Sequence, residues 1–509
     1  MPIERAGSFR GRALRGTFAP WCAALNVGLV LGCSAGGSDG KVTRGIEPGS
    51  VVDPGAGSAG TPKDPPILSG PPESTTGDLF RDPDDVPRST GFTEAAPIRR
   101  RGLLEKQVTC PGGGTTSVSG TVYIPSGQLP LYNVMVYVPD AELRPFTPGA
   151  SCSCEITGEP IASALTDATG HFVVENVPVG ADIPLVIQVG DWRREFNIGS
   201  VEACADHPIA PQTLRLPSRQ SEGDIPKIAV ATGKADALEC LVRKLGVDES
   251  EFGGEDGPGR VTLFAGGGTE RYASLNGAAR FPSVQSLWRN VDALSRYDVV
   301  LMSCDGREDD LEDKSERSIQ AMADYLNLGG RVFGSHFQNM WFKNGPAPFS
   351  SLADFESQQD LGSVSGQVVT SFPKGRAMSE WLVNAGATQA AGQVAIAGAQ
   401  HSILGENPEY TQRWIATESP EPSVQYISAN TPLGVSDAEQ CGRLVLSDIH
   451  VSPGGAKDDI SDPSEDFPEG CVTSDLTPQE AVLAFMLFDL SGCVVPDDQV
   501  PVAPPIILR

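Results

Sequence analysis

The sequence has few basic residues. Its 509 residues include 38 Lys and Arg against 65 Asp and Glu, so the formal net charge is −27 at pH 7. A field of that sign repels phosphates, and the sequence carries no basic stripe or aromatic-rich RNA-binding motif to offset it. Nucleic acids and anionic lipid surfaces are therefore excluded as expected partners, and we interpret the charge as serving solubility.

Long apolar runs are also scarce. After residue 32, none approaches the ~20 residues of a membrane-spanning helix. Before it, an apolar run from about Phe18 to Leu31 follows a basic stretch, which is the layout of a secretory signal. The basic residues of that stretch are Arg5, Arg10, Arg12 and Arg15.

The apolar run is followed by Gly32-Cys33, which resembles a bacterial lipobox. The resemblance implies a signal peptide over residues 1–32, cleavage before Cys33, and acyl chains that anchor the protein to a membrane. Ser34 is not the Asp of inner-membrane retention, so we expect an outer-membrane lipoprotein facing the periplasm or the exterior. The alternative is an uncleaved anchor or a mis-assigned start.

Residues 33–107 are rich in Gly, Ser, Pro and Asp and poor in apolar residues. Such a segment cannot bury enough apolar surface to offset the entropy lost on ordering. We predict a disordered linker that tethers the folded domains to the anchor.

Eleven cysteines become nine once Cys22 is removed with the signal and Cys33 is lipidated. The cell envelope is oxidising, so we expect disulfides and, because nine is odd, at least one free thiol. One scheme leaves Cys304 unpaired, with the pairs Cys240–Cys493 and Cys441–Cys471. Another four cysteines fall together in an earlier segment, namely Cys110, Cys152, Cys154 and Cys204.

Residues 108–216 contain short runs with an apolar residue at every second position, a pattern that predicts a small β-sandwich. The runs are Val118, Val122 and Ile124, then Val134, Val136 and Val138, and later Leu185, Ile187 and Val189. The stretch from Thr166 to Phe172 resembles the carboxypeptidase regulatory-like domain. That resemblance implies a transthyretin-like, seven-stranded accessory module without catalysis.

The resemblance does not imply peptidase activity. A zinc carboxypeptidase holds its metal with a His that is followed three positions later by a Glu. None of the five histidines has a Glu at that spacing; they are His171, His207, His336, His401 and His450.

Residues 224–495 alternate strand-like and helix-like patterns. We expect strands near residues 227–232, 260–265, 297–302, 331–334 and 443–447, and a closing helix near 478–490. The alternation predicts a mostly parallel, flavodoxin-like α/β sheet with helices on both faces. The chain is thus predicted to be multidomain, with an unassigned insertion at 340–440 and a tail at 496–509.

Chemistry-bearing residues follow three of these strands. Cys304 and Asp305 follow the third, His336 the fourth, and Asp448 and His450 the last. Ligands bind beyond the carboxyl ends of strands in parallel sheets, so these groups are expected to share one rim. A thiol, imidazoles and carboxylates suit acid–base, nucleophilic or metal chemistry.

Two runs, Gly329 to His336 and Gly442 to His450, resemble the ThuA-like branch of the class I glutamine amidotransferase-like superfamily. The resemblance implies that His336 and His450 are the functional positions, and it points to sugar utilisation without a defined reaction. True amidotransferases have a glycine-flanked Cys at the tight elbow where this chain has His336, and Gln338 replaces the second glycine. Glutamine hydrolysis by that triad is therefore not expected.

Each candidate has a structural alternative. A catalytic thiolate at Cys304 needs a lowered pKa, which the adjacent Asp305 opposes. His336 and His450 with a nearby carboxylate suit zinc, but single histidines at strand ends are more often hydrogen-bonded rim residues, so we expect no metal and no cofactor. Five aromatic residues can stack a sugar, although core packing is the better expectation for most: Trp288, Phe337, Trp341, Phe342 and Trp381.

Three functions remain open. The first, which we favour, is a lipid-anchored envelope protein that binds a glycan or an envelope protein without catalysis. The second is a carbohydrate hydrolase or isomerase that uses His336 and His450, with Cys304 and Asp305 as further candidates. The third is a purely structural surface lipoprotein.

Overall fold

The computed structural model describes residues 101–306, 314–356, 360–451 and 460–504. The chain divides into two units, Met1–Phe92 and Thr93–Arg509, and every described residue belongs to the second. The expected signal peptide, Cys33 and the expected linker up to residue 100 therefore lie outside the described residues. Within the described residues, no helix combines the length and the apolar character that crossing a membrane requires.

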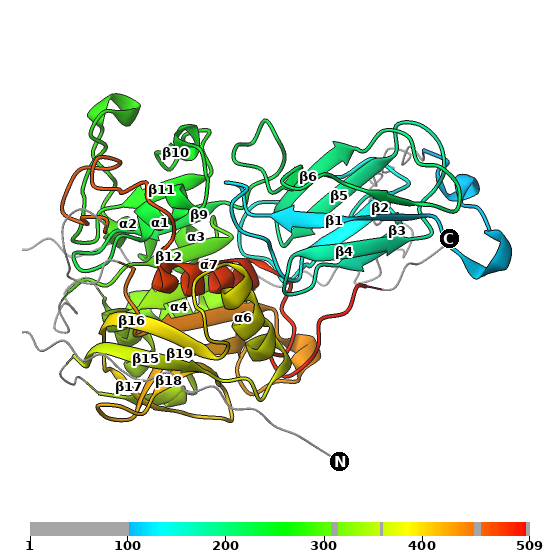
Figure 1. Cartoon of the computed structure of the whole chain (residues 1–509). Coiled ribbons are helices and arrows are strands. Elements are labelled where there is room, and N and C mark those ends of the chain that lie inside the picture. Colours follow the sequence, from blue (N-terminus) through cyan, green and yellow to red (C-terminus); the bar gives the residue numbers. More distant parts are fainter. Residues whose placement is uncertain (1–100, 307–313, 357–359, 452–459, 505–509) are drawn as a thin grey trace, which may run out of the picture. The chain divides into compact units, whose positions relative to one another are not determined.

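Two four-stranded sheets form the first part of the second unit (Figure 1). One has the order β4-β1-β7, with β8 also paired to β1, and the other has the order β3-β2-β5-β6. The strands are β1 (Ser117–Tyr123), β2 (Met135–Pro139), β3 (Pro160–Leu165), β4 (His171–Glu175), β5 (Pro184–Val189), β6 (Trp192–Asn197), β7 (Asp206–Pro208) and β8 (Leu214–Arg215).

The inner faces of these two sheets share one apolar core. Val122 and Phe172 from the first sheet and Val136 and Ile187 from the second belong to the same buried cluster. The runs of alternating residues in the sequence correspond to β1, β2 and β5. The short helices η1 (Leu104–Lys106) and η2 (Pro111–Gly113) precede β1, and Leu103 packs into the core with 4% of its surface exposed. The packed structure therefore begins before residue 108, within the stretch assigned to the linker.

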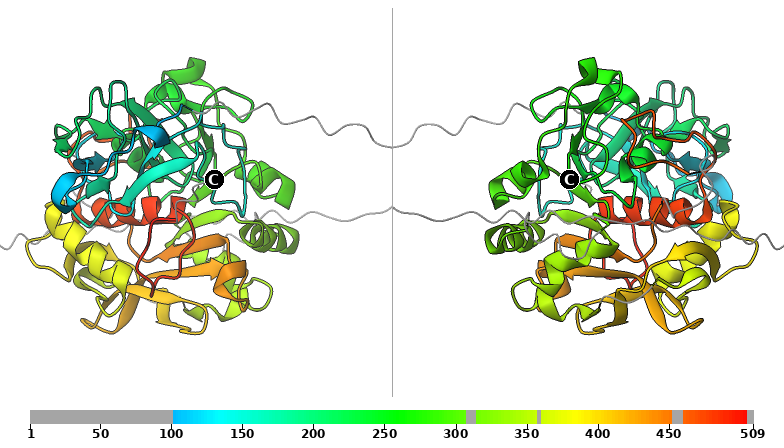
Figure 2. Two further views of the ribbon diagram at one scale, coloured as in Figure 1. Left: turned by 90° about the vertical axis from the view of Figure 1, so that its right-hand side faces the viewer. Right: turned by 90° about the vertical axis from the view of Figure 1, so that its left-hand side faces the viewer.

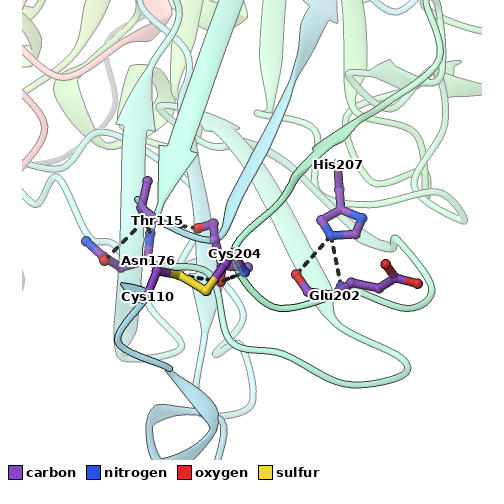
Figure 3. Close-up of a disulfide and its surroundings, with 7 residues drawn as sticks. Cys110, Thr115, Asn176, Glu202, Cys204 and His207 are labelled. Atoms are coloured by element: carbon purple, nitrogen blue, oxygen red, sulfur yellow. Dashed lines mark hydrogen bonds between the residues drawn. A yellow bond between two sulfur atoms is a disulfide. The ribbon is translucent and has the colours of Figure 1, made fainter. Parts of the chain in front are cut away.

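The Cys110–Cys204 disulfide ties the chain before β1 to the chain before β7 (Figure 3). The backbone N–H of Cys204 donates to Thr116 Oγ1 at 2.9 Å. In the same view, the N–H of Glu202 donates to Nε2 of His207 at 2.8 Å. His207 therefore stabilises a loop.

The second part is built on a ten-stranded sheet with the order β10-β11-β9-β12-β13-β20-β19-β18-β15-β16. The six strands from β10 to β20 in this order are parallel, and the remaining four are antiparallel. The strands are β9 (Ile228–Ala231), β10 (Phe252–Gly253), β11 (Val261–Phe264), β12 (Val299–Met302), β13 (Arg331–Ser335), β15 (Gly362–Val368), β16 (Gln393–Ala399), β18 (Gln412–Thr417), β19 (Ser423–Thr431) and β20 (Gly442–Ser447). A separate pair consists of β14 (Ala353–Phe355) and β17 (Ile403–Glu406).

All five strands expected in this part are present, as β9, β11, β12, β13 and β20. The expectation of a mostly parallel sheet is too simple, because the insertion at 340–440 adds four antiparallel strands and makes the sheet mixed. Strand β15 has the sequence Gly-Ser-Val-Ser-Gly-Gln-Val and buries only part of one face. Its sparse apolar pattern explains why the sequence did not identify it.

Helices cover both faces of the sheet. Alternate residues of β12 point to different cores: Leu301 joins the cluster that contains α1, α6 and α7, whereas Val300 joins the cluster that contains α2 to α5. The helices are α1 (Leu238–Lys244), α2 (Val284–Leu287), α3 (Val291–Leu294), α4 (Glu316–Asn327), α5 (Met340–Lys343), α6 (Pro373–Asn384) and α7 (Pro478–Ser491).

Helix α7 connects the two parts of the unit. It lies against the sheet, as the red helix beside the orange and yellow strands in Figure 2, and contacts β13, β16 and β20. Its Phe485 stacks on Tyr132 at 5.7 Å between ring centroids, and its Phe488 contacts Trp192 at 5.9 Å. The core of the first part therefore continues through α7 into the α/β part.

Two disulfides also cross between the parts, Cys152–Cys441 and Cys154–Cys493, and a third, Cys240–Cys471, lies within the α/β part. The expected pairs Cys240–Cys493 and Cys441–Cys471 are therefore wrong. The loop before Cys152 reaches the α/β part, where the N–H of Gly149 donates to Asp298 at 2.6 Å, and sequence spacing carries no sign of that approach. Cys304 is the free cysteine of the described residues, as the scheme expected.

Candidate functional site

Cys304, His336 and His450 meet at one edge of the sheet. They follow β12, β13 and β20, which are neighbours in the order of strands. The Cys304 Sγ lies 3.5 Å from Nδ1 of His336, and the rings of His336 and His450 have centroids 5.3 Å apart. One candidate ligand atom from each of the three residues lies within 4.8 Å of the other two. The expected convergence of the thiol and the two imidazoles is therefore present.

The three side chains are buried. Cys304 has 0%, His336 7% and His450 6% of its surface exposed. Residues 307–313 and 452–459, which follow this edge in the sequence, lie outside the described residues.

His336 occupies a strained turn directly after β13. Its φ is 44°, in the left-handed region that non-glycine residues rarely adopt, and it opens the short helix η5 (His336–Asn339). A β-carbon added to Gly334 would lie 2.9 Å from Leu446 and 3.2 Å from Gln338, so Gly334 lets η5 fold back over the strand. Strain of this kind persists where the surrounding structure enforces it, and it is frequent at functional sites.

The chain after β9 packs closely against the end of β12. A β-carbon on Gly233 would lie 2.3 Å from the Cys304 carbonyl oxygen, and the N–H of Ala235 donates to the same oxygen at 3.1 Å. Only glycine allows this approach, which fixes the backbone at Cys304.

Asp305 does not join the group of three. Its carboxylate accepts from Lys314 Nζ at 2.5 Å and from Gln338 Nε2 at 2.8 Å. Gln338 also donates to the carbonyl of Ser303 at 2.7 Å and accepts from Trp341 Nε1 at 2.8 Å. Asp305 is a candidate catalytic residue in the sequence, but in the structure its carboxylate is already engaged in holding β12 against η5.

Asp448 also has a structural set of partners. Its carboxylate accepts from the N–H of Ser402 at 2.7 Å, from the Ser402 hydroxyl at 2.6 Å and from the N–H of Ile403 at 2.9 Å. Burial raises the pKa of Asp448, although these hydrogen bonds oppose the shift. The carboxylate thus ties β17 to the end of β20.

Asp236, which no sequence pattern singled out, supports both histidines. This buried residue follows β9, and its carboxylate accepts from the Ser335 hydroxyl at 2.6 Å and from the N–H of Val451 at 2.9 Å. Ser335 precedes His336 and Val451 follows His450, so one carboxylate positions the chain beside both imidazoles. Its location after a parallel strand was the available signal.

The protonation states suit electron-pair donors better than acids or bases. Burial, with a further contribution from His450, lowers the pKa of His336 to about 3. Burial raises the pKa of the Cys304 thiol to about 12. At neutral pH the imidazole of His336 and the thiol of Cys304 are therefore both uncharged.

Two polar atoms near this edge are buried without a hydrogen-bond partner among the described residues. They are Nε2 of His450 and Oγ of Ser303. An unsatisfied buried polar atom costs about 1–3 kcal/mol, so each marks a place where a bound group would add a partner. With the thiol and His336, a ring nitrogen of His450 completes a donor set that could hold a metal ion.

Phe337 is the aromatic residue of this edge. It is half-buried, and its ring stacks on that of His336 at 3.8 Å between centroids. The other aromatic candidates are buried core residues, which agrees with the expectation of core packing for most of them: Trp288, Trp341, Phe342 and Trp381.

No protein-family model and no curated protein matches the chain. Similar solved structures include a proposed GMP synthase component from Thermoplasma acidophilum, 9% identical, which covers 52% of this chain and 94% of that chain with a TM-score of 0.29. They also include a proposed ThuA-like protein of Bacteroides uniformis, 11% identical, with 51% and 88% covered and a TM-score of 0.26. A cohesin–X-dockerin complex of Acetivibrio cellulolyticus is 18% identical, with 26% and 85% covered and a TM-score of 0.15. Likeness at this level carries no inference about activity.

Proposed function

We propose that this chain is a lipid-anchored cell-envelope protein whose α/β part binds a small glycan-derived ligand without transforming it. The observation that carries the proposal is the convergence of Cys304, His336 and His450 at the ends of three neighbouring parallel strands. Open α/β sheets bind their ligands at this edge. The anchor is a lipid on Cys33, and the outer membrane is the proposed location.

We assign the α/β part to the ThuA-like branch of the glutamine amidotransferase-like superfamily, with a flavodoxin-like sheet. The five strands β11, β9, β12, β13 and β20 lie side by side in that order, which is 2-1-3-4-5 by their appearance in the sequence. The positive φ of His336 provides a tight elbow after the fourth of them. These two features support the assignment.

We assign the first part to the carboxypeptidase regulatory-like modules, as a transthyretin-like sandwich with an accessory role. Two four-stranded sheets with a shared core support this assignment. The two disulfides to the α/β part fit a module that stabilises its neighbour.

Binding fits the site better than catalysis does. A general acid or base works best with a pKa near the working pH, whereas His336 and the Cys304 thiol have pKa values displaced far from neutrality. The carboxylate of Asp305, which directly follows Cys304 in the sequence, is paired with Lys314. His336 and the Cys304 thiol therefore offer donor atoms but are poor proton carriers near neutral pH.

A neutral saccharide is the ligand class that suits this edge. The net charge of −27 disfavours anionic ligands. The half-buried ring of Phe337 offers an apolar surface for stacking against a sugar.

The alternative is a carbohydrate hydrolase or isomerase that uses His336 and His450. The 5.3 Å between their ring centroids favours it, because both imidazoles can then reach one substrate group. Turnover of a saccharide that depends on both residues would select this alternative.

The test is a thermal-shift and calorimetric titration of the full-length chain in detergent with neutral mono- and oligosaccharides from bacterial envelopes. We expect at least one of them to raise the unfolding temperature of the wild type and to lose its effect in Phe337→Ala and His450→Gln. His207→Gln, which alters a loop of the first part, is the matched control and should bind normally. The proposal is contradicted if no saccharide raises the unfolding temperature of the wild type, or if His450→Gln binds the saccharide as tightly as the wild type does.

A further inference from the structure

We propose that Cys304, His336 and His450 together bind one divalent metal ion of the zinc class. This inference rests on the proposed function in one respect, since it takes the same rim to be the binding site. It adds the identity of a bound group and the residue that supplies each donor atom.

The spacing of the donors fits a tetrahedral ion. Zinc binds thiolate sulfur at ~2.3 Å and imidazole nitrogen at ~2.0–2.1 Å, which places two ligands of one ion about 3.3–3.8 Å apart. The 3.5 Å between Cys304 Sγ and His336 Nδ1 falls within that range. All three donor atoms lie within 4.8 Å of one another, so a small side-chain adjustment brings the third to bonding distance.

The types of donor select the class of metal. One thiol and two neutral imidazoles suit zinc and related borderline ions, whereas calcium and magnesium prefer oxygen ligands. Binding requires the thiol to release its proton to solvent, and the ion then stabilises the thiolate.

The surroundings supply compensating charge and support. The carboxylate of Asp236 acts electrostatically on Cys304, so a cation placed there is attracted to it, whereas the charge of Asp305 is offset by its ion pair with Lys314. Asp236 also fixes Ser335 and Val451, which flank the two imidazoles in the sequence. Supports of this kind orient ligands in known metal sites.

The nitrogen without a partner is a second observation beside the spacing of the donors. His450 exposes only 6% of its surface, and its Nε2 has no hydrogen-bond partner among the described residues. A metal ion would satisfy it. Three protein ligands leave a fourth tetrahedral position, which a hydroxyl oxygen of the proposed saccharide can occupy.

The test is metal analysis of the full-length chain, first as purified and then after chelation and reloading with Zn²⁺ or Co²⁺ alone. We expect one ion per chain and, with Co²⁺, the charge-transfer absorption of a thiolate–cobalt bond together with tetrahedral ligand-field bands. Cys304→Ser should lose the charge-transfer band, and both Cys304→Ser and His450→Gln should bind Zn²⁺ more weakly, on the order of 100-fold.

His401→Gln is the matched control, because His401 is equally buried in the same part of the chain and does not belong to the group of three. It should retain wild-type affinity and spectrum. Circular dichroism of the metal-free variants establishes that they fold, and the wild-type cobalt spectrum tests the inference even if a variant does not. A wild-type spectrum without thiolate absorption, or equal affinity in Cys304→Ser, overturns the inference.

The two proposals can fail separately. Metal binding is measured without saccharide, and saccharide binding is measured on both the stripped and the loaded chain. Metal binding without any saccharide effect leaves this inference standing and removes the proposed ligand. Saccharide binding by a chain that takes up no metal contradicts the metal inference and leaves the proposed saccharide ligand standing.

Discussion

Glu239 shows how strongly one position can depend on pH. It lies in the first turn of α1 with 1% of its surface exposed, and its Oε2 has no partner among the described residues. Burial raises the pKa of this carboxyl group to about 8, and the charge of Asp236 adds to the increase. At pH 7 the group is therefore mostly protonated in the folded chain and ionised in the unfolded chain.

Glu239→Gln should stabilise the protein at pH 8 and much less at pH 5. Because the folded pKa lies above the unfolded value of ~4.3, the wild type loses stability as the pH rises from there to about 8. The amide has no proton to lose, so we expect a gain on the order of 2–4 kcal/mol at pH 8. Urea unfolding at the two pH values measures it. Glu142→Gln, an exposed control, should change little, and a gain independent of pH contradicts the explanation.

Single residues at the rim were only partly accessible from the sequence. His336, His450 and Cys304 follow predicted strands, so their position at one edge could be inferred. The engagement of Asp305 with Lys314 and Gln338 could not, because it depends on how η5 folds back over β12. Asp236 was missed for the same reason, since its partners are 99 and 215 residues away in the sequence.

At the scale of elements, the segment after α7 is held by a buried ion network. Lys374 from α6 and Arg443 from β20 contact Asp489 and Asp497 at 2.7–3.1 Å, and each of these side chains has at most 7% exposure. Burial alone raises the pKa of Asp497, but Arg443 and Lys374 outweigh it and lower the pKa to about 2. The expected tail at 496–509 therefore begins with a packed segment.

Asp497→Ala should destabilise the protein by about 3–5 kcal/mol, because it leaves buried cations without one of their carboxylates. The adjacent Asp498 is exposed, so Asp498→Ala is the matched control and should stay within ~0.5 kcal/mol of the wild type. Urea unfolding at pH 7 compares the three proteins. Equal stability of the two variants would show that the network contributes nothing.

Elements with a strong apolar pattern were predictable, and weakly patterned ones were not. Helix α7 is apolar on every side, which is typical of a buried helix, and it packs between the sheet and Tyr132 and Trp192 of the first part. In contrast, β15 has only two valines among glycine and polar residues, and only its pairing in the sheet defines it as a strand.

At the scale of the whole molecule, the disulfides provide a direct check. Non-reducing peptide mapping should recover Cys110–Cys204, Cys240–Cys471 and crosslinks from the Cys152 to Cys154 stretch to Cys441 and Cys493. Iodoacetamide should reach the buried Cys304 only after unfolding. Replacing Cys152 and Cys441 by Ser should cost about 2–4 kcal/mol in urea unfolding. A Cys240–Cys493 peptide would refute this connectivity.

The proposed anchor is tested by Cys33→Ser. This change should abolish incorporation of labelled fatty acid and move the protein from the membrane to the soluble fraction, because the acyl chains provide the attachment. Cys22→Ser lies in the expected signal peptide and should be labelled normally. If Cys33→Ser is labelled as strongly as the wild type, the lipid is attached elsewhere and the proposed anchor at Cys33 is wrong.

The sequence by itself determined the strongly patterned strands and helices, the order in which they occur, and the three residues at the ends of β12, β13 and β20. These follow from local periodicity and from the geometry of parallel sheets. Only the tertiary structure decided the antiparallel extension, the pairing of the cysteines and the partners of Asp236, Asp305 and Asp497. Each of these depends on distances between segments far apart in the chain, which packing fixes and local sequence does not encode.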